Sequence, residues 1–250
     1  MSKIPFGALL IHGFTATPDS FRGITPHLES LGIPCKLPTL RGHGADTPEA
    51  LVGVHWTDWI ADCENALIEL CTEAEQAIVL GHSLGGWLAL NLAVDHQEKI
   101  DSIIIAGAST RCVSPLTPGR PFHFLFPLLV KLLKKWDMPS VYADPELAQY
   151  DPTYDWVPMD SFIPLFDFLK VTKKRLPEVN VPILILHSKN DSSNAPEGVD
   201  VLYHTISTPG DQKQVVWFEK TEHDMFLDCE GEEMTRTVVE YVKQRMDHAR

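Results

Sequence analysis

A serine lies between two glycines directly after a predicted buried strand. The pentapeptide Gly81-His-Ser83-Leu-Gly85 follows the apolar run 77–80 and precedes an apolar pattern with helical spacing over 87–94. A strand, a sharp turn and a helix in this order hold the serine in a strained backbone conformation, with its hydroxyl projecting from the turn. Any Cβ in place of either glycine would collide across so tight a turn. Ser83 is therefore predicted to be a nucleophile.

A base and an acid that could activate this serine follow two later strands. Asp191 comes after the predicted strand 181–186, and His223 comes after the predicted strand 213–218. A serine nucleophile needs a base to take its proton and a third group to orient that base. Asp224 neighbours the base, but adjacent side chains in an extended turn point apart, so Asp191 is the preferred orienting acid. The predicted catalytic set is Ser83, Asp191 and His223.

Two backbone N–H groups are predicted to stabilise a developing oxyanion. The apolar strand 6–11 runs directly into His12-Gly13-Phe14, which places a flexible loop at the carboxyl edge of the sheet. The N–H of Phe14 can then point at a substrate oxygen, together with the N–H of Leu84, the residue after the serine. Each such donor lowers the barrier of acyl transfer by roughly 3–4 kcal/mol.

Apolar strands alternate along the chain with segments of helical spacing. The predicted strands are 6–11, 33–38, 77–81, 101–106, 181–186 and 213–218, and the predicted helices are 18–31, 56–72, 84–96, 195–206 and 231–247. This alternation predicts a mostly parallel sheet with helices on both faces. A length of 250 residues suits one domain with a full core.

Composition excludes several other classes of function. A formal net charge of −13 argues against nucleic acid as a partner and disfavours docking to an anionic membrane. The five cysteines are odd in number and lack the spacing of metal ligands, so we expect reduced thiols, no metal site and a cytoplasmic protein. No targeting segment is visible, and the longest apolar stretch, 122–133, is too short to span a bilayer.

The chain resembles the α/β-hydrolases, and most closely the small bacterial carboxylesterases and monoacylglycerol lipases. The resemblance covers nearly the whole chain and is most specific at residues 10–15, 40–44, 81–86 and 222–223, with the order Ser83, Asp191, His223 typical of this fold. It implies a reduced sheet without the first two strands of the full fold, an aromatic oxyanion donor at Phe14, and no cofactor. One departure is that Asp191 is followed by three polar residues, where the family usually has an apolar one.

The resemblance also implies a short helical lid above an acyl pocket. We expect the core to comprise 1–110 and 176–250, with the proline-rich stretch 111–175 inserted as the lid. The apolar residues of 122–136 could pack onto the core or line the acyl pocket, and both alternatives stay open. His82 is included among the pocket candidates although its ring is expected to face the sheet. The predicted substrate-binding residues are Phe14, His82, Phe122, Phe126, Leu129 and Trp136.

Together these features predict a serine hydrolase that acts on a small-molecule carboxylic ester through an acyl-enzyme. A small lid cannot enclose a long chain as fully as a large one, so we expect short- to medium-chain acyl esters, and the resemblance alone suggests monoacylglycerols as the specific candidate. The same triad also serves thioesterases, peptidases and C–C bond hydrolases, so these stay alternatives. A slowly reacting small-molecule receptor with this fold is a further alternative.

Overall fold

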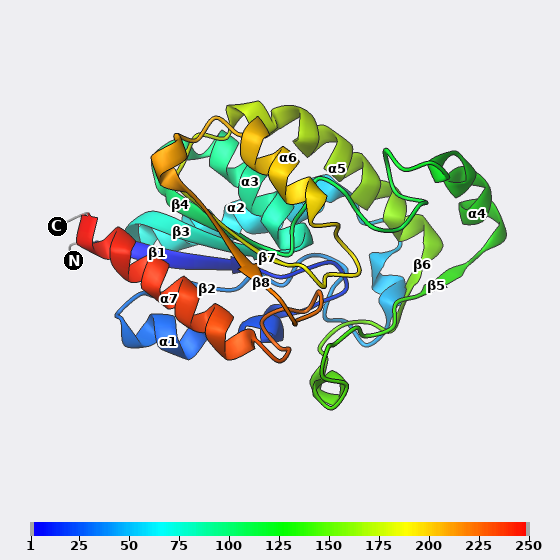
Figure 1. The fold of residues 1–250 in the computed structure, drawn as a ribbon, viewed down its shortest axis with the longest axis horizontal. Coiled ribbons are helices and arrows are strands. Elements are labelled where there is room, and N and C mark those ends of the chain that lie inside the picture. The colour runs from blue at the N-terminus through cyan, green and yellow to red at the C-terminus, as the bar shows by residue number, and fades with distance from the viewer. Residues whose placement is uncertain (1–2, 249–250) are drawn as a thin grey trace.

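Six strands form the central sheet of the computed structural model, which describes residues 3–248. The strand order is β2-β1-β3-β4-β7-β8, and every neighbouring pair is parallel (Figure 1). These strands are β1 (Ile4–Ile11), β2 (Cys35–Lys36), β3 (Ala74–His82), β4 (Ile100–Ala106), β7 (Ile183–Ser188) and β8 (Lys213–Phe218). The reduced parallel sheet predicted from the sequence is confirmed. The ends of the predicted domain, residues 1–2 and 249–250, lie outside the described residues.

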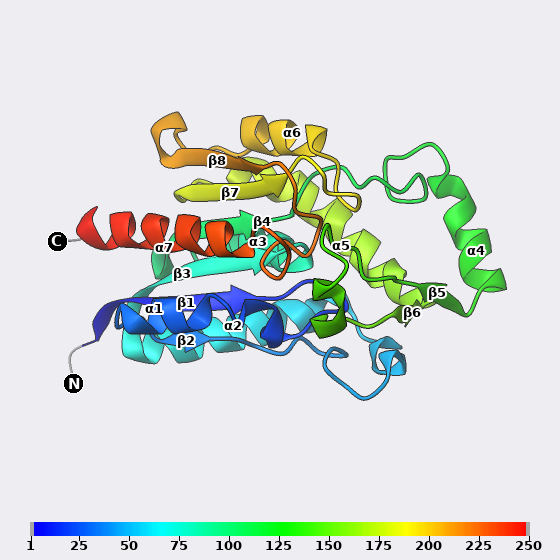
Figure 2. The same ribbon diagram turned by 60° about the horizontal axis from the view of Figure 1, so that its bottom comes forward.

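Helices cover both faces of this sheet, as the alternating pattern predicted (Figure 2). They are α1 (Thr25–Ser30), α2 (Trp56–Glu73), α3 (Leu84–Asp95), α4 (Phe126–Leu132), α5 (Phe162–Arg175), α6 (Glu197–Thr205) and α7 (Gly231–His248). The single helix expected over 18–31 is instead a short 3-10 turn at Pro18–Phe21 followed by α1. Pro26 explains the break, because proline has no N–H to donate within a helix but fits its first turn.

The strands carry apolar side chains on both faces, and these alternate between two separate clusters. Leu9 and Ile103 belong to the cluster under α2, α3, α5 and α6, whereas Leu10 and Ile104 belong to the cluster under α1 and α7. A side-chain period of two sends neighbouring residues of a strand to opposite faces. Strands that are buried on both faces read as continuous apolar runs, which is why the sequence showed no alternation there.

The strand order of the sheet has a topological switch point between β1 and β3. β2 lies on one side of β1, and β3, β4, β7 and β8 follow on the other side. The loops after β1 and β3 therefore diverge and leave a crevice at the carboxyl ends of the strands, where ligands bind in open α/β sheets. The loop after β1 carries the predicted oxyanion donor Phe14, and the loop after β3 carries the predicted nucleophile Ser83.

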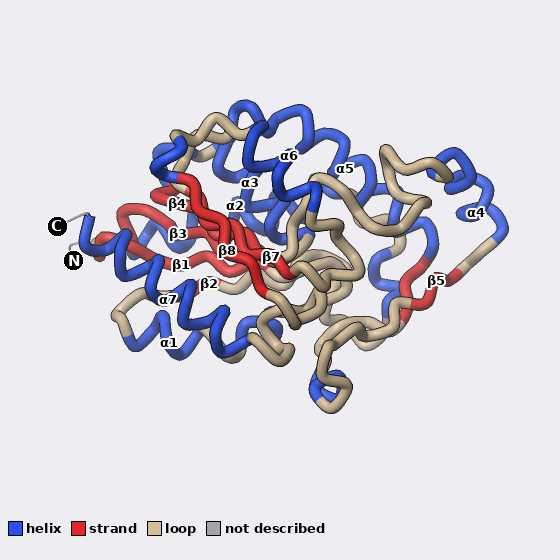
Figure 3. Tube along the Cα trace, in the orientation of Figure 1, coloured by secondary structure: helices blue, strands red, loops and turns tan. Residues whose placement is uncertain are grey.

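The segment from the end of β4 to α5 forms a separate layer beyond this crevice. It contains α4 and a small antiparallel pair, β5 (Lys135–Asp137) and β6 (Trp156–Pro158), at the end of the molecule opposite the termini (Figures 1 and 3). The last helix of the predicted lid, α5, packs into the core, where Phe168 is fully buried. Among residues 3–248, none of the helices combines the length and the apolar character that crossing a membrane requires.

Candidate active site

Ser83 occupies the turn between β3 and α3 in a backbone conformation that side chains rarely adopt. Its φ of 51° and ψ of −113° lie outside the regions that L-residues favour, and its N–H donates to the carbonyl of Ala106 at 2.8 Å. Thr15, with a φ of 71°, is the other described non-glycine residue with positive φ. Both line the same cavity, and strained residues of this kind gather at functional sites.

The two glycines of the pentapeptide are required by close backbone contacts. A Cβ on Gly81 would collide with the carbonyl of Gly85, and a Cβ on Gly85 would collide with the carbonyl of Ile11 on the neighbouring strand. Neither obstacle is a flexible side chain that could move aside. The start of α3 thus approaches the ends of β1 and β3 closely, and this approach fixes the position of the Ser83 hydroxyl.

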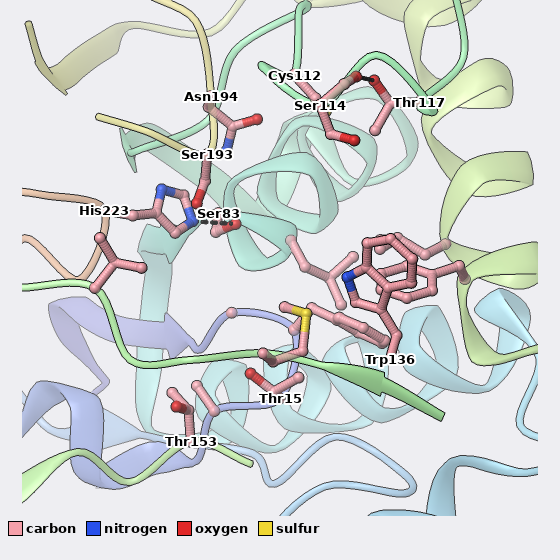
Figure 4. A pocket seen from close by; sticks show the side chains of 18 of the residues that line it. Thr15, Ser83, Cys112, Ser114, Thr117, Trp136, Thr153, Ser193, Asn194 and His223 are labelled. Carbon is pink, nitrogen blue, oxygen red and sulfur yellow. Dashed lines mark hydrogen bonds between the residues drawn. The ribbon is translucent and has the colours of Figure 1, made fainter. Parts of the chain in front are cut away.

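Three loops bring the hydroxyl, the imidazole and the carboxylate into contact. His223 Nε2 lies 2.9 Å from Ser83 Oγ (Figure 4). On the other side of the ring, His223 Nδ1 lies 2.9 Å from Asp191 Oδ2. The second oxygen of Asp191 accepts the N–H groups of Ser193 and Asn194, both at 2.8 Å. A carboxylate held in this way favours the tautomer in which Nδ1 carries the proton and Nε2 accepts from the serine.

Neighbouring carboxylates raise the pKa of His223, which makes its imidazole a stronger base. Burial lowers the pKa of His223. The carboxylate of Asp191 raises it through its charge and its hydrogen bond, and the charges of Asp224 and Glu222 raise it further, so that the pKa of His223 is about 9. Burial opposes ionisation of Asp191, but the charge and hydrogen bond of His223 leave the pKa of this carboxyl below its ordinary value. The pair therefore stabilises an imidazolium next to a carboxylate.

Two further histidines hold the loops around this site. His82 Nε2 donates to the carbonyl of His223 at 2.7 Å, and His12 Nε2 accepts the N–H of Leu40 at 3.1 Å. Burial is the main cause that lowers the pKa of each ring to about 3, so both are neutral hydrogen-bonding groups. His82 borders the cavity, but its bond to the His223 backbone makes it a positioning group for the imidazole.

The proposed oxyanion donors are free to bind a ligand. Within residues 3–248, the N–H groups of Phe14 and Leu84 donate to no acceptor, and both residues border the cavity beside Ser83. Leu84 is the first residue of α3, so its N–H lacks a partner within the helix and lies at the positive end of the helix dipole. These are the properties that an oxyanion site requires.

A cavity of about 330 Å³ opens next to Ser83. Figure 4 shows Ser193, Asn194 and His223 on one side and Trp136 across the cavity. The part of the wall away from His223 is mainly apolar and comes from α3, α4, α5 and the β5–β6 layer. Its larger apolar residues are Trp87, Phe126, Trp136, Met159, Phe162, Leu165, Phe166 and Leu169. The three polar residues after Asp191, which depart from the family pattern, form a polar part of the wall.

The predicted substrate-binding residues divide into two groups. Phe14, His82, Phe126 and Trp136 border the cavity, whereas Phe122 and Leu129 do not. The Phe122 side chain is 53% exposed, because it precedes the short helix on the outer side of the lid layer. Leu129 instead packs partly buried against the core cluster.

Several cavity residues were not among the sequence candidates. Phe162, Leu165, Phe166 and Leu169 form one stripe of α5, spaced as i, i+3, i+4 and i+7. That spacing is a readable signal for one helix face, but it does not say whether the face meets a core or a cavity. Trp87 on α3 gave no separate signal, because all of that helix up to Ala93 is buried.

Asp224 is a further acidic residue at the edge of the cavity. Burial is the main cause that raises the pKa of Asp224 to about 6. The charges of Asp151 and Asp191 also raise this pKa, and the charge of His223 lowers it. No hydrogen bond joins its carboxyl to the His223 ring, whose Nδ1 is bonded to Asp191. Among residues 3–248, no group of three or more His, Cys, Asp or Glu side chains is arranged to hold a metal ion.

Comparisons with known proteins identify the family of this chain. The model of the family described as serine aminopeptidase, S33, matches residues 8–230. A thermostable monoacylglycerol lipase of Bacillus sp. strain H-257 is 30% identical over 227 residues, covering 90% of this chain and 85% of the lipase. A carboxylesterase of Bacillus subtilis strain 168 is 25% identical over 239 residues, covering 94% of this chain and 92% of the esterase.

The fold also matches solved structures over nearly its full length. A structure from work on LipS and LipT, two metagenome-derived lipolytic enzymes, superposes with a TM-score of 0.86 at 23% identity, covering 98% of this chain and 96% of that one. At this identity the superposition establishes the fold, while the family match and the two Bacillus relatives establish the kind of enzyme. The chain belongs to the serine aminopeptidase S33 family of α/β-hydrolases and is a serine hydrolase with lipase- or esterase-like activity.

Proposed function

We propose that this enzyme hydrolyses short- to medium-chain carboxylic esters, with monoacylglycerols as the specific candidate, through an acyl-enzyme on Ser83. The observation that carries the proposal is the unbroken chain of contacts from Asp191 through His223 to the Ser83 hydroxyl, at 2.9 Å for each step, beside a mainly apolar cavity. An apolar wall suits an acyl chain, and the polar groups near His223 suit an alcohol.

Each residue of the site has a role in a two-step reaction. His223 Nε2 takes the proton of Ser83 while Ser83 Oγ attacks the ester carbonyl, and the N–H groups of Phe14 and Leu84 bind the oxyanion. His223 then gives the proton to the leaving alcohol, which leaves an ester between the acyl group and Ser83. Water repeats the sequence, with His223 again as base, and releases the carboxylic acid. Asp191 keeps the imidazole in the tautomer and orientation that both steps need.

The size of the cavity supports the limit on chain length. Its volume of about 330 Å³ is near the lower end of the roughly 300–1,000 Å³ typical of small-molecule sites. The names of the two Bacillus relatives, a monoacylglycerol lipase and a carboxylesterase, favour an oxygen ester over a thioester or an amide.

A substrate panel with a nucleophile variant tests this proposal. We expect the enzyme to hydrolyse monoacylglycerols and 4-nitrophenyl esters of short and medium chains faster than an acyl-CoA thioester or an aminoacyl amide. A fluorophosphonate probe should label the enzyme once, and Ser83→Ala should abolish both labelling and turnover while melting as the parent does. Turnover retained by Ser83→Ala would refute the nucleophile assignment, whereas labelling without turnover of any ester would favour the receptor alternative.

A further inference from the structure

The turn after Asp191 presents a polar group to the cavity that the proposed reaction does not use. Asn194 is only 8% exposed and borders the cavity. Its Nδ2 donates to the carbonyl of Gly107 at 2.8 Å, and this bond fixes which way the amide faces. The Oδ1 of Asn194 accepts no hydrogen bond from a described residue. In Figure 4 this oxygen points toward the side of the cavity that carries Ser114.

Hydrogen bonds of the backbone hold this amide in place. The N–H of Asn194 donates to Asp191 Oδ1 at 2.8 Å, and the carbonyl of Asn194 accepts from His187 Nε2 at 3.0 Å. Because Asp191 also bonds the ring of His223, the position of the amide is tied to that of the imidazole. A buried acceptor that is held rigidly and has no donor from the protein calls for an explanation, and a ligand that donates to it is one.

A second acceptor without a donor comes from the loop that carries His223. Asp224 borders the cavity, and its carboxyl accepts no hydrogen bond from a described residue. Burial is the main cause that raises the pKa of this carboxyl to about 6, and the charges of Asp151 and Asp191 also raise it. A buried carboxylate is unfavourable unless donors or a counter-charge satisfy it. The described residues give Asp224 no donor, so the carboxyl is free to accept from a ligand.

Both acceptors belong to the loops that hold the His223 imidazole. His223 Nε2 has to reach the oxygen of the leaving alcohol in order to protonate it. The alcohol of the substrate therefore lies on this polar side of the cavity. The acyl chain faces the apolar wall, which comes from α3, α4, α5 and the β5–β6 layer. Asn194 and Asp224 are thus placed to contact the alcohol rather than the acyl chain.

We propose that Asn194 and Asp224 form a subsite for the leaving alcohol that selects a neutral polyol and disfavours an anionic alcohol. This inference rests on the proposed function, because it concerns the alcohol of the same ester. A hydroxyl can donate to an amide oxygen and to a carboxylate, whereas an anionic group on the alcohol meets the like charge of Asp224. Acceptors on two separate loops suit donors that are spread over several carbon atoms, which a polyol has and a single ammonium group does not.

Butyrate esters of different alcohols test the subsite. Glycerol 1-butyrate carries free hydroxyls, propyl butyrate has the same carbon chain without them, and the butyrate of glycerol 3-phosphate carries an anion. All of them form the same butyryl-enzyme, so their kcat/KM values differ only through steps that involve the alcohol. The parent should prefer the glycerol ester to the propyl ester at least about tenfold in kcat/KM, as hydrogen bonds to a neutral and a charged acceptor predict. It should hydrolyse the phosphate ester more slowly than the glycerol ester.

Variants remove the acceptors one at a time, and the measured quantity is the glycerol-to-propyl ratio of kcat/KM. Asp224→Leu should lower this ratio about tenfold and Asn194→Val about fivefold. Asp224→Asn keeps an acceptor but loses the charge, so it should raise the relative rate of the phosphate ester at least about threefold. Because each ratio is taken within one variant, the effect of Asp224 on the pKa of His223 cancels.

Thr117→Val is the matched control on the same cavity. The Thr117 hydroxyl donates to the carbonyl of Ser114 at 2.8 Å, and valine has nearly the same shape as threonine. This variant should keep the glycerol-to-propyl ratio within about twofold of the parent's, because the hydroxyl that it removes already has a partner.

Each outcome decides the proposal. Equal kcat/KM for the glycerol and propyl esters in the parent would overturn the subsite and leave ester hydrolysis standing, as would ratios that Asp224→Leu and Asn194→Val change no more than the control does. Faster hydrolysis of butyrylcholine than of the glycerol ester would overturn it in favour of a site for cations. Failure to hydrolyse any of these esters would refute the proposed function and this inference together. If Asn194→Val does not fold because Gly107 loses its donor, Asp224→Leu decides by the same ratio.

Discussion

Replacing Asp191 by asparagine tests the geometry of the site without changing its shape. Asparagine is isosteric with aspartate and keeps one oxygen, which can still accept the N–H groups of Ser193 and Asn194, now 2.8 Å from Asp191 Oδ1. The loop that carries residue 191 should therefore stay folded. The position now occupied by Oδ2, 2.9 Å from His223 Nδ1, would then hold an NH₂ group that can only donate.

The expected loss follows from the tautomer that this change imposes. When an amide donates to Nδ1, the imidazole proton must sit on Nε2, which faces the Ser83 hydroxyl and can no longer accept its proton. Loss of this function in comparable triads lowers kcat about 10⁴-fold, equivalent to about 5 kcal/mol in the barrier. We expect a loss of that order for Asp191→Asn in 4-nitrophenyl butyrate hydrolysis, with a melting temperature within a few degrees of the parent's.

Asp224→Asn is the matched control, because it removes the carboxyl adjacent in sequence to the same histidine. That carboxyl raises the pKa of His223 by its charge but does not bond the ring. The rate requires neutral His223 and rises with pH through its pKa, so Asp224→Asn should move the acid limb of the kcat/KM profile to lower pH. The maximum rate should fall less than about tenfold. A loss of less than tenfold in Asp191→Asn, with a large loss in Asp224→Asn, would refute the assignment of Asp191.

Three other changes probe the fold, the cavity and the effect of acid. Gly85→Ala should lower the melting temperature sharply and abolish activity, because its Cβ would meet the carbonyl of Ile11; an unchanged melting curve would contradict the close approach. Phe166→Ala should cost about 3–5 kcal/mol in the free energy of unfolding and shift the chain-length optimum of the esters upward, a shift measured with a nitrophenyl ester series. Burial lowers the pKa of His12 and His82 from 6.5 to about 3, so the unfolded chain binds protons that the folded chain does not as pH falls below 6.5. Urea unfolding should therefore show a loss of about 2 kcal/mol per histidine between pH 7 and about pH 5, and no loss would contradict the burial of these rings as neutral groups.

The sequence predicted the parts of this protein that depend on local backbone requirements. The glycines at 81 and 85 are fixed by contacts with backbone atoms, so the serine between them could be identified without a structure. The six strands were found because each is an apolar run that both faces of the sheet bury. Their ends were less certain, and the run predicted over 33–38 contributes only Cys35–Lys36 to the sheet, because strand length depends on pairing rather than on composition.

The walls of the cavity could not be predicted in the same way, because they depend on how the lid layer folds back. Phe122 and Phe126 are four residues apart in one apolar segment, yet the first is exposed and the second borders the cavity. An apolar residue in such a segment can face the core, the cavity or the outside, and its type is the same in each case. The two alternatives left open for 122–136 are both present, and exposure to solvent, as for Phe122 and Phe124, is a third.

The same limit applies to the charge of the chain. A net charge of −13 describes an average over the whole surface, whereas a partner meets one face and responds to charges within a screening length of it. The acid-free interval between Asp101 and Asp137 is visible in the sequence, but its meaning depends on where the chain places it. The lid layer joins this basic interval to a later stretch that contains Asp137, Asp144, Glu146, Asp151, Asp155 and Asp160, so the two signs of charge are separated along the chain within one layer. The distribution of charge along the chain, read against the fold, is therefore more informative about the partner of this site than the total.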